Sequence, residues 1–138
     1  MVLVSAFMLA ADSKPNFTGT WELNLQKSDL GGVPITKLVV QVEHKDPVLK
    51  YTATGTAGGE DFTEVENLST DGKPTANSQG TVKAYWDGTI LVVETTGPDG
   101  QPVDASRLAL SPDGKTMTRE YERKTADPQK RHDVYDKR

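Results

Sequence analysis

Residues 35–45 read ITKLVVQVEHK, and this stretch decides the fold class of the chain. Its apolar residues Leu38, Val40 and Val42 alternate with Gln41 and other polar neighbours. A side-chain period of two is typical of a β-strand that buries one face and leaves the other in water. The stretch therefore predicts a strand in an antiparallel sheet with one covered face.

Runs of the same kind follow on both sides of this stretch. We predict strands over 18–25, 35–45, 48–56, 61–69, 78–86, 89–96, 102–110 and 115–124, with a ninth through 130–136. In the eighth, Met117, Arg119, Tyr121 and Arg123 share one face, which we expect to point inward. In the fourth, Glu64 and Glu66 are expected to point outward into solvent.

Asp-Gly pairs separate many of these runs. They stand at 71–72, 87–88, 99–100 and 113–114, and the spacing between them leaves no room for helices. Glycine accepts a positive φ and aspartate tolerates it better than most residues, so each pair suits a tight hairpin. We therefore predict consecutive antiparallel strands.

An open sheet of this size would leave two long unpaired edges. Closure into a barrel removes such edges, so we predict an all-β protein with a single antiparallel up-and-down β-barrel of 8–9 strands. The rival is a two-sheet sandwich with Greek-key crossings, which needs longer connections. Residues 26–34 form the single long, glycine-rich connection.

Length and composition limit the functional classes. The 138 residues are 35% hydrophobic and contain no cysteine, which excludes disulfides, thiolate zinc sites and cysteine nucleophiles. The net charge is −4, with a basic C-terminal part on an acidic body; such a pattern is either a solvated surface or a face for an anionic ligand. A pI of about 5.1 argues against nucleic-acid binding.

The N-terminal residues have a different character from the rest. Residues 1–11 are uncharged and mostly apolar, which is typical of a secretory segment and too short to span a bilayer. We expect residues 1–14 to be a signal-peptide remnant or N-terminal extension and residues 15–138 to be the barrel domain. The alternative is a short helix packed on the domain. Export to the periplasm or the extracellular space is the expectation.

Residues 16–23, NFTGTWEL, resemble the first strand of the calycins, the group that contains lipocalins and fatty-acid-binding proteins. The resemblance implies that Gly19 lets the strand approach closely and that Trp21 plugs one end of the barrel. The whole chain looks like the small exported lipocalin-like proteins of environmental bacteria. It departs from fatty-acid-binding proteins because residues 26–34 cannot form their helical lid.

Residues 118–123, TREYER, are similar to the closing strand of fatty-acid-binding proteins. There an Arg-x-Tyr pair holds a ligand carboxylate, which implies that role for Arg119 and Tyr121. Residues 134–137, VYDK, are a second match, but the arginine two positions before the tyrosine is absent. An inward Arg119 must meet an internal acid, stack on Trp21 or receive a ligand anion, since an unpaired buried guanidinium is costly.

These observations define the candidate site. The ligand-binding candidates are Trp21, Tyr51, Trp86, Arg119, Tyr121 and Arg123. His44 and His132 are the two histidines of the chain and have no metal-ligand spacing, and we expect His44 to lie half-exposed at a rim. No catalytic group, metal or cofactor is predicted.

We therefore expect a non-enzymatic barrel that binds a small apolar, amphipathic or carboxylate molecule. One alternative is a filled barrel that acts through its surface. The other is a small hydrolase or isomerase that uses Arg119 with His44.

Overall fold

The computed structural model describes residues 14–125 and 127–138, and within that part of the chain it consists of strands, turns and loops. The strands are β1 (Gly19–Leu23), β2 (Ile35–Lys45), β3 (Val48–Ala57), β4 (Glu60–Ser69), β5 (Thr75–Asn77), β6 (Gly80–Asp87), β7 (Ile90–Thr96), β8 (Pro102–Leu110), β9 (Thr116–Arg123) and β10 (Gln129–Lys137). The all-β prediction is confirmed, with ten strands instead of eight or nine. The predicted secretory segment falls almost wholly on residues 1–13, outside the described residues, so export stays a prediction.

Within the described residues, the structure offers no helix with the length and apolar character that crossing a membrane requires.

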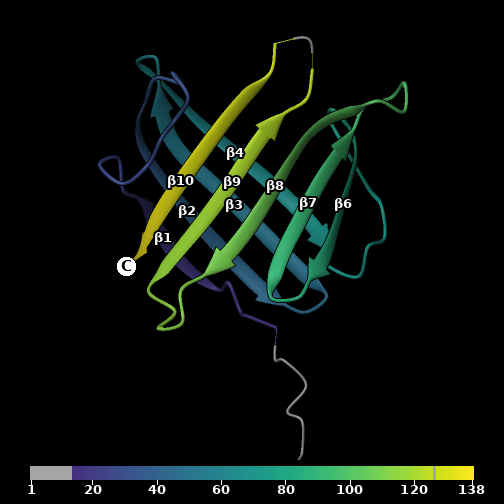
Figure 1. Ribbon diagram of the computed structural model, residues 1–138, viewed down its shortest axis with the longest axis horizontal. Helices are drawn as coiled ribbons and strands as arrows, with labels where there is room; N and C mark the ends of the chain where they lie inside the picture. The colour runs from purple at the N-terminus through teal and green to yellow at the C-terminus, as the bar shows by residue number, and fades with distance from the viewer. Residues whose placement is uncertain (1–13, 126) are drawn as a thin grey trace, which may run out of the picture.

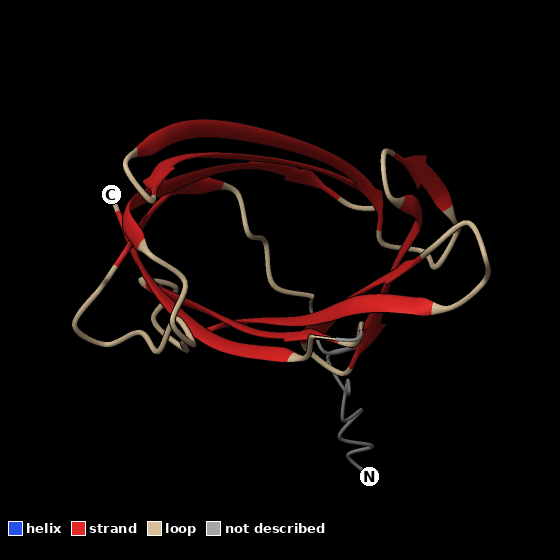
Figure 2. Cartoon of the chain, turned by 90° about the horizontal axis from the view of Figure 1, so that it is seen from above, coloured by secondary structure: helices blue, strands red, loops and turns tan. Residues whose placement is uncertain are grey.

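The ten strands form one antiparallel sheet in the order β4-β3-β2-β1-β10-β9-β8-β7-β6-β5 (Figure 1). Neighbours in the sheet are neighbours in the chain except where β1 pairs with β10, with Trp21 opposite Lys137 and Leu23 opposite Tyr135. Seen from above, the strands make a ring (Figure 2). The up-and-down barrel is therefore confirmed, with its first and last strands side by side.

The ring is nearly, and not fully, closed by backbone hydrogen bonds. β4 and β5 are the two edges of the sheet. Asn77 of β5 donates from Nδ2 to Glu66 Oε1 of β4 at 3.5 Å, and the Gly72 N–H, in the connection between the two edges, donates to the Ala84 carbonyl of β6 at 2.8 Å. The prediction that Asp71-Gly72 makes a tight hairpin is wrong, because this turn bridges the gap between the edges and does not join two paired strands.

Another Asp-Gly pair behaves as predicted. Asp87 pairs with Ile90, so the turn between β6 and β7 has two residues, and Gly88 takes φ 61° there. That left-handed conformation favours glycine. An Asp-Gly pair therefore predicts the hairpin between β6 and β7 correctly, but it does not predict a hairpin between β4 and β5, the two edges of the sheet.

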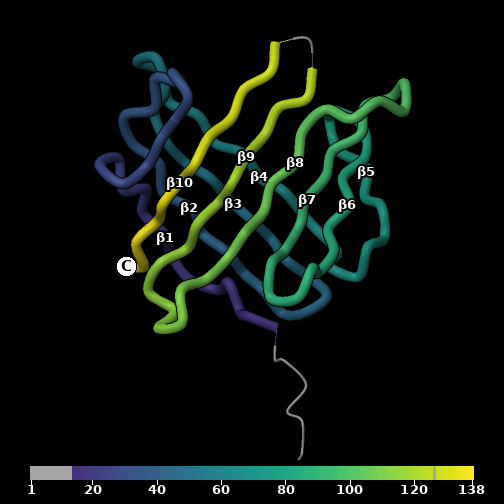
Figure 3. The backbone as a smooth tube through the Cα atoms, in the orientation of Figure 1, coloured from purple at the N-terminus to yellow at the C-terminus, as the bar shows by residue number. Residues whose placement is uncertain are grey.

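The connection between β1 and β2 lies along β10 (Figure 3). Asp29 and His132 exchange two backbone hydrogen bonds of 2.8 and 2.7 Å. A Cβ at Gly31 would lie 2.3 Å from the Lys130 carbonyl, so this close approach requires glycine. The connection is thus fixed to the barrel wall without a helix.

The period of two in β2 is confirmed, since Leu38, Val40 and Val42 are all buried on the inner face. The expectation for β4 is wrong. Leu68 and Phe62 face inward, and residues an even number of positions apart share a face, so Glu64 and Glu66 point inward as well. Val65 between them is 53% exposed on the outer face.

Candidate functional site

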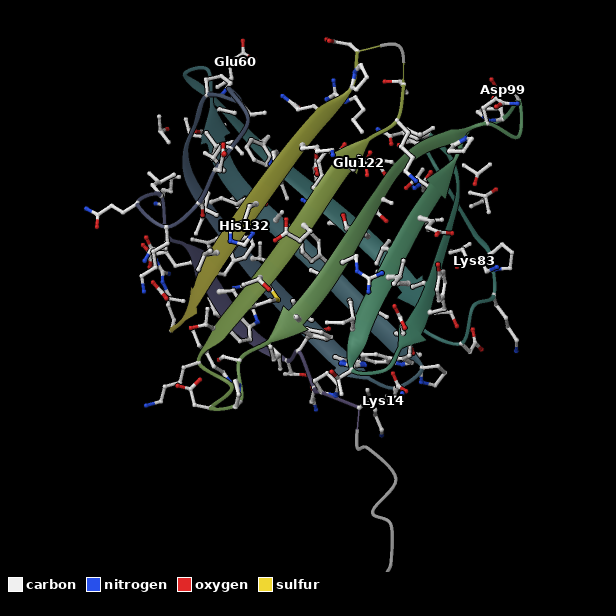
Figure 4. The ribbon with its side chains drawn as sticks, in the orientation of Figure 1. Lys14, Glu60, Lys83, Asp99, Glu122 and His132 are labelled. Atoms are coloured by element: carbon white, nitrogen blue, oxygen red, sulfur yellow. The ribbon has the colours of Figure 1, made fainter. Side chains whose placement is uncertain are left out.

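Segment 14–18 crosses one end of the ring before β1 begins (Figure 2). Lys14 Nζ donates to the Gly88 carbonyl at 2.7 Å on one side of this opening. On the other side the Trp21 indole donates to the Phe17 carbonyl at 2.9 Å. We call this the closed end; in Figure 4 it is the end at which Lys14 lies, opposite Glu60 and Asp99.

Aromatic rings fill the closed end. Phe17 and Trp86 stack with ring centroids 6.1 Å apart, and His44 stacks on both at 5.9 and 6.0 Å. Trp21 has no exposed surface and Phe17 has 1%. Close packing of this kind excludes water from this end of the barrel.

The other half of the inner face is polar, and we call it the polar cluster. Its members are Tyr51, Glu64, Glu66, Asp104, Ser106, Arg119, Tyr121, Arg123, Arg131, Asp133 and Tyr135. They reach the same space because β3, β4, β8, β9 and β10 each place alternate residues inward. Most of the charged members keep accessible surface, unlike the apolar residues of the closed end.

Asp133 is the buried anion of the polar cluster. It is fully buried, and Arg131 binds it through two hydrogen bonds, Nη2 to Oδ2 at 2.6 Å and Nε to Oδ1 at 3.2 Å. The Tyr135 hydroxyl donates to Oδ2 at 3.1 Å, and Arg119 Nη1 lies 3.7 Å from the same oxygen. This satisfies a buried carboxylate, which would otherwise be strongly destabilising.

Arg119 is oriented by its neighbours but keeps 23% of its side-chain surface accessible. Its Nε donates to Ser106 Oγ at 3.1 Å, and its guanidinium lies 4.8 Å from the centre of the Tyr121 ring. The Arg131 guanidinium lies 5.6 Å from the same ring, so Tyr121 contacts both cations. Two guanidinium groups thus share the carboxylate of Asp133.

Tyr51 and Tyr135, two further phenols of the polar cluster, keep their protons at neutral pH. Burial raises the pKa of Tyr51, and burial together with the neighbouring Tyr51 raises the pKa of Tyr135 well above its ordinary value. Both hydroxyls therefore stay neutral and can donate or accept hydrogen bonds.

Glu66 and Asp104 add carboxylates to the polar cluster. Burial, and after it the negative charge of Asp104, raises the pKa of Glu66. Asp104 accepts a hydrogen bond from the Tyr121 hydroxyl at 3.3 Å. These carboxylates offer acceptors for hydroxyl, amide or ammonium groups.

The six predicted ligand-binding residues divide between the two halves. Tyr51, Arg119, Tyr121 and Arg123 all lie on the inner face and come together in the polar cluster. Trp21 and Trp86 lie at the closed end instead. Of the three alternatives for Arg119, the structure shows the pairing with an internal acid.

The expectation of a half-exposed His44 is wrong. Its side chain is only 3% exposed and lies at the closed end, not half-exposed at a rim, because Phe17 and Trp86 cover the end of β2. It is bonded to Phe17 and Asp46, whereas Arg119 is bonded to Ser106. His44 and Arg119 therefore have separate hydrogen-bond partners.

Sequence reasoning missed Asp133, Arg131 and Glu66. The alternation Arg131-x-Asp133-x-Tyr135 on one face of β10 is the signal that could have found the first two. For Glu66, the signal was the spacing from Leu68, the buried residue on the same face.

Two depressions lie on the outside of the sheet. One of about 350 Å³ is lined by Arg107, Glu120 and His132, and one of about 570 Å³ by Lys37, Thr54 and other residues of β2 to β4. Most of their lining residues belong to the outer face, but the first is also lined by Tyr121 and Arg131 of the polar cluster and the second by Phe62.

Comparison with known proteins supports the fold. No protein-family model matches the chain, and no curated protein matches it. Among solved structures, the crystal structure of zebrafish ileal bile acid-binding protein complexed with cholic acid is similar, with a TM-score of 0.62 and 13% identity. The match covers 88% of this chain and 98% of that one. The fold is therefore a calycin-like, nearly closed antiparallel barrel.

The structure corrects one residue assignment taken from the resemblance to fatty-acid-binding proteins. The strand that closes the barrel against β1 is β10, so Arg119 and Tyr121 of β9 do not belong to the closing strand. On β10 the inward tyrosine is Tyr135, and the residue two positions before it is Asp133, not an arginine. The adjacent strand β9 brings Arg119 to that carboxylate.

Proposed function

We propose that the polar cluster binds a small amphipathic molecule that carries one acidic group, and that this group approaches Arg119. The observation that carries the proposal is an inner-face guanidinium that is held in place and still accessible. Asp133 receives its shortest contacts from Arg131, so Arg119, at 3.7 Å, keeps capacity for a second anion.

The rest of the ligand is inferred from what surrounds Arg119. Glu64, Glu66 and Asp104 would repel a second negative charge and accept hydrogen bonds from neutral donors. The apolar residues toward the closed end would contact the hydrocarbon part. These features favour a mostly apolar acid that also carries hydroxyl or amide groups.

The similarity in fold supports the same class of ligand. The zebrafish protein was crystallised with cholic acid, which combines a carboxylate, hydroxyl groups and an apolar body. Small barrels of this kind can hold one small ligand inside.

Calorimetric titration with cholic acid and with its methyl ester tests the proposal. We expect the acid to bind more tightly, and Arg119→Gln to weaken the acid about tenfold, the weight of one hydrogen bond to a charged group. The ester should bind both forms equally, because it lacks the charge.

Arg107→Gln is the matched control, since Arg107 lies on the outer face and pairs with Asp87 at 2.8 Å. It should leave both affinities unchanged. Equal weakening of acid and ester by Arg119→Gln would remove Arg119 from its proposed role, and failure of both probes to bind would favour a filled barrel.

A further inference from the structure

The closed end depends on one histidine in one protonation state. The backbone N–H of Phe17 donates to His44 Nδ1 at 3.1 Å. A backbone N–H can only donate, so Nδ1 must carry a lone pair and no proton. Nε2 is then the protonated nitrogen, and it donates to Asp46 Oδ1 at 2.8 Å.

The hydrogen bond between Phe17 and His44 Nδ1 belongs to a set of contacts that holds segment 14–18 across the barrel. The carbonyl of Phe17 accepts from the Trp21 indole at 2.9 Å, and Thr18 Oγ1 bonds the backbone of His44 twice, at 3.0 Å each. The imidazole also stacks on Phe17 and Trp86. A change at His44 therefore acts directly on the segment that covers this end.

A second proton on His44 must go to Nδ1, since Nε2 already carries one. Two N–H groups would then face each other at the position of the present 3.1 Å hydrogen bond. The His44 side chain is only 3% exposed, so water cannot satisfy either donor while the segment stays in place. Movement of Phe17 away from the ring relieves the conflict.

Two charged groups lie beside His44 and the aromatic rings of the closed end: Asp46, from the turn after β2, and Lys14, from segment 14–18. Asp46 favours the imidazolium, but it already accepts the Nε2 proton of the neutral ring and is 48% exposed, which weakens the added attraction. Lys14, whose Nζ lies 5.7 Å from the centre of the Trp86 ring, adds repulsion. The remaining neighbours, Thr70 and Trp86, carry no charge.

Hydrogen bonds stabilise the charged form of Asp46. Partial burial pushes the pKa of Asp46 up, but hydrogen bonds from Thr70, at 2.6 Å, and from His44 outweigh it and leave the pKa below its ordinary value. Histidine is the side chain that ordinarily changes charge between about pH 5 and 8.

We propose that His44 is a proton-operated latch: a proton taken up at Nδ1 releases Phe17, and with it segment 14–18, from the closed end of the barrel. The open form binds one more proton than the closed form, so opening is favoured as pH falls. This device does not depend on the ligand proposed above.

The two tryptophans report on the latch in the full-length protein. We would record the indole N–H signals of Trp21 and Trp86 by NMR from pH 8 to pH 5, with far-UV circular dichroism to follow the sheet. The hydrogen-exchange protection of the Trp21 indole, relative to its intrinsic rate, should fall about fivefold to tenfold, the equilibrium weight of one hydrogen bond. The circular dichroism should stay constant.

The variant His44→Gln removes the titrating group, and its Trp21 signal should not change with pH. His132→Gln is the matched control, because His132 lies on the outer face beside Glu120, and it should behave as the wild type. A transition that persists in His44→Gln, or a wild-type Trp21 signal that does not change over this range, would overturn the proposal. So would loss of the sheet signal in step with Trp21, which would mean global unfolding.

Asp46→Asn provides a second variant should His44→Gln fail to fold. Without the carboxylate, His44 holds its added proton less well, so the transition of Trp21 should move to lower pH. A transition that stays in place or moves to higher pH contradicts the latch.

Discussion

The closed end and the polar cluster, the two halves of the barrel interior, differ in the side chains that fill them. At the closed end, Phe17, Trp21 and Trp86 pack together, and His44 Nδ1 accepts a hydrogen bond from the backbone of Phe17. In the polar cluster, charged groups on neighbouring strands satisfy one another and Arg119 stays accessible. The comparison shows that packed rings fill one end of the barrel, whereas the other half keeps a charged side chain accessible.

The largest effect should come from Trp21→Ala, which removes the largest fully buried side chain of the closed end. We expect the free energy of unfolding to fall by about 3–5 kcal/mol, from lost burial and the cavity left behind. Denaturant unfolding measures it. Trp21→Phe, which keeps most of the ring, should lose less; equal losses would mean that the hydrogen bond to Phe17, and not burial, dominates.

Next in size should be Asp133→Asn, which leaves Arg119 and Arg131 without their shared carboxylate. Breaking a buried ion pair on one side should destabilise the fold by about 3 kcal/mol. Denaturant unfolding of the double variant Asp133→Leu with Arg131→Met is the informative control, because replacing the whole pair by apolar groups is often neutral. A double variant as unstable as the single one would show that the polar cluster is needed for the fold itself.

The smallest change in the free energy of unfolding should come from Glu66→Gln, and it should be an increase. Because burial raises the pKa of Glu66 in the folded state, its carboxylate opposes folding above that pKa, and this penalty is gone below the ordinary value of 4.5. Removing the charge should therefore raise the free energy of unfolding at pH 7 by a few tenths to about 1 kcal/mol, after allowance for solvent screening.

Denaturant unfolding at pH 7 and pH 4 checks this, and the gain should vanish at pH 4. Glu60→Gln, at the exposed start of β4, is the control and should have no effect at either pH. If Glu66→Gln still raised the free energy of unfolding at pH 4, the charge of Glu66 would not be the cause of the increase.

Much of the fold could be predicted because burial and periodicity agree in most strands. In β2 the alternate apolar residues Leu38, Val40 and Val42 identify the face that points inward. In β9 the alternation from Met117 to Arg123 identifies the inner face in the same way. β4 could not be assigned this way, because acidic residues occupy alternate positions and only Leu68 and Phe62 reveal which face is buried. The charge of Glu64 and Glu66 was misleading there, because the polar half of the inner face keeps solvent-accessible surface.

The candidate site could be predicted only in part. Arg119, Tyr121, Arg123 and Tyr51 were found because period two aims them at one interior. Asp133 was missed because its partners come from two strands, and such a pairing depends on register. The gap at Asp71 was missed because a turn sequence does not reveal whether the strands beside it are paired.

The pairing of β1 with β10 has a consequence for how the chain could be rewired. If the ends were linked and the chain opened between β4 and β5, the strand sequence would follow the sheet order from β5 through β10 and β1 to β4. No backbone ladder would be cut, and every pairing would become local in sequence. A circular permutant of this design would have a lower contact order than the native chain and should fold faster at similar stability.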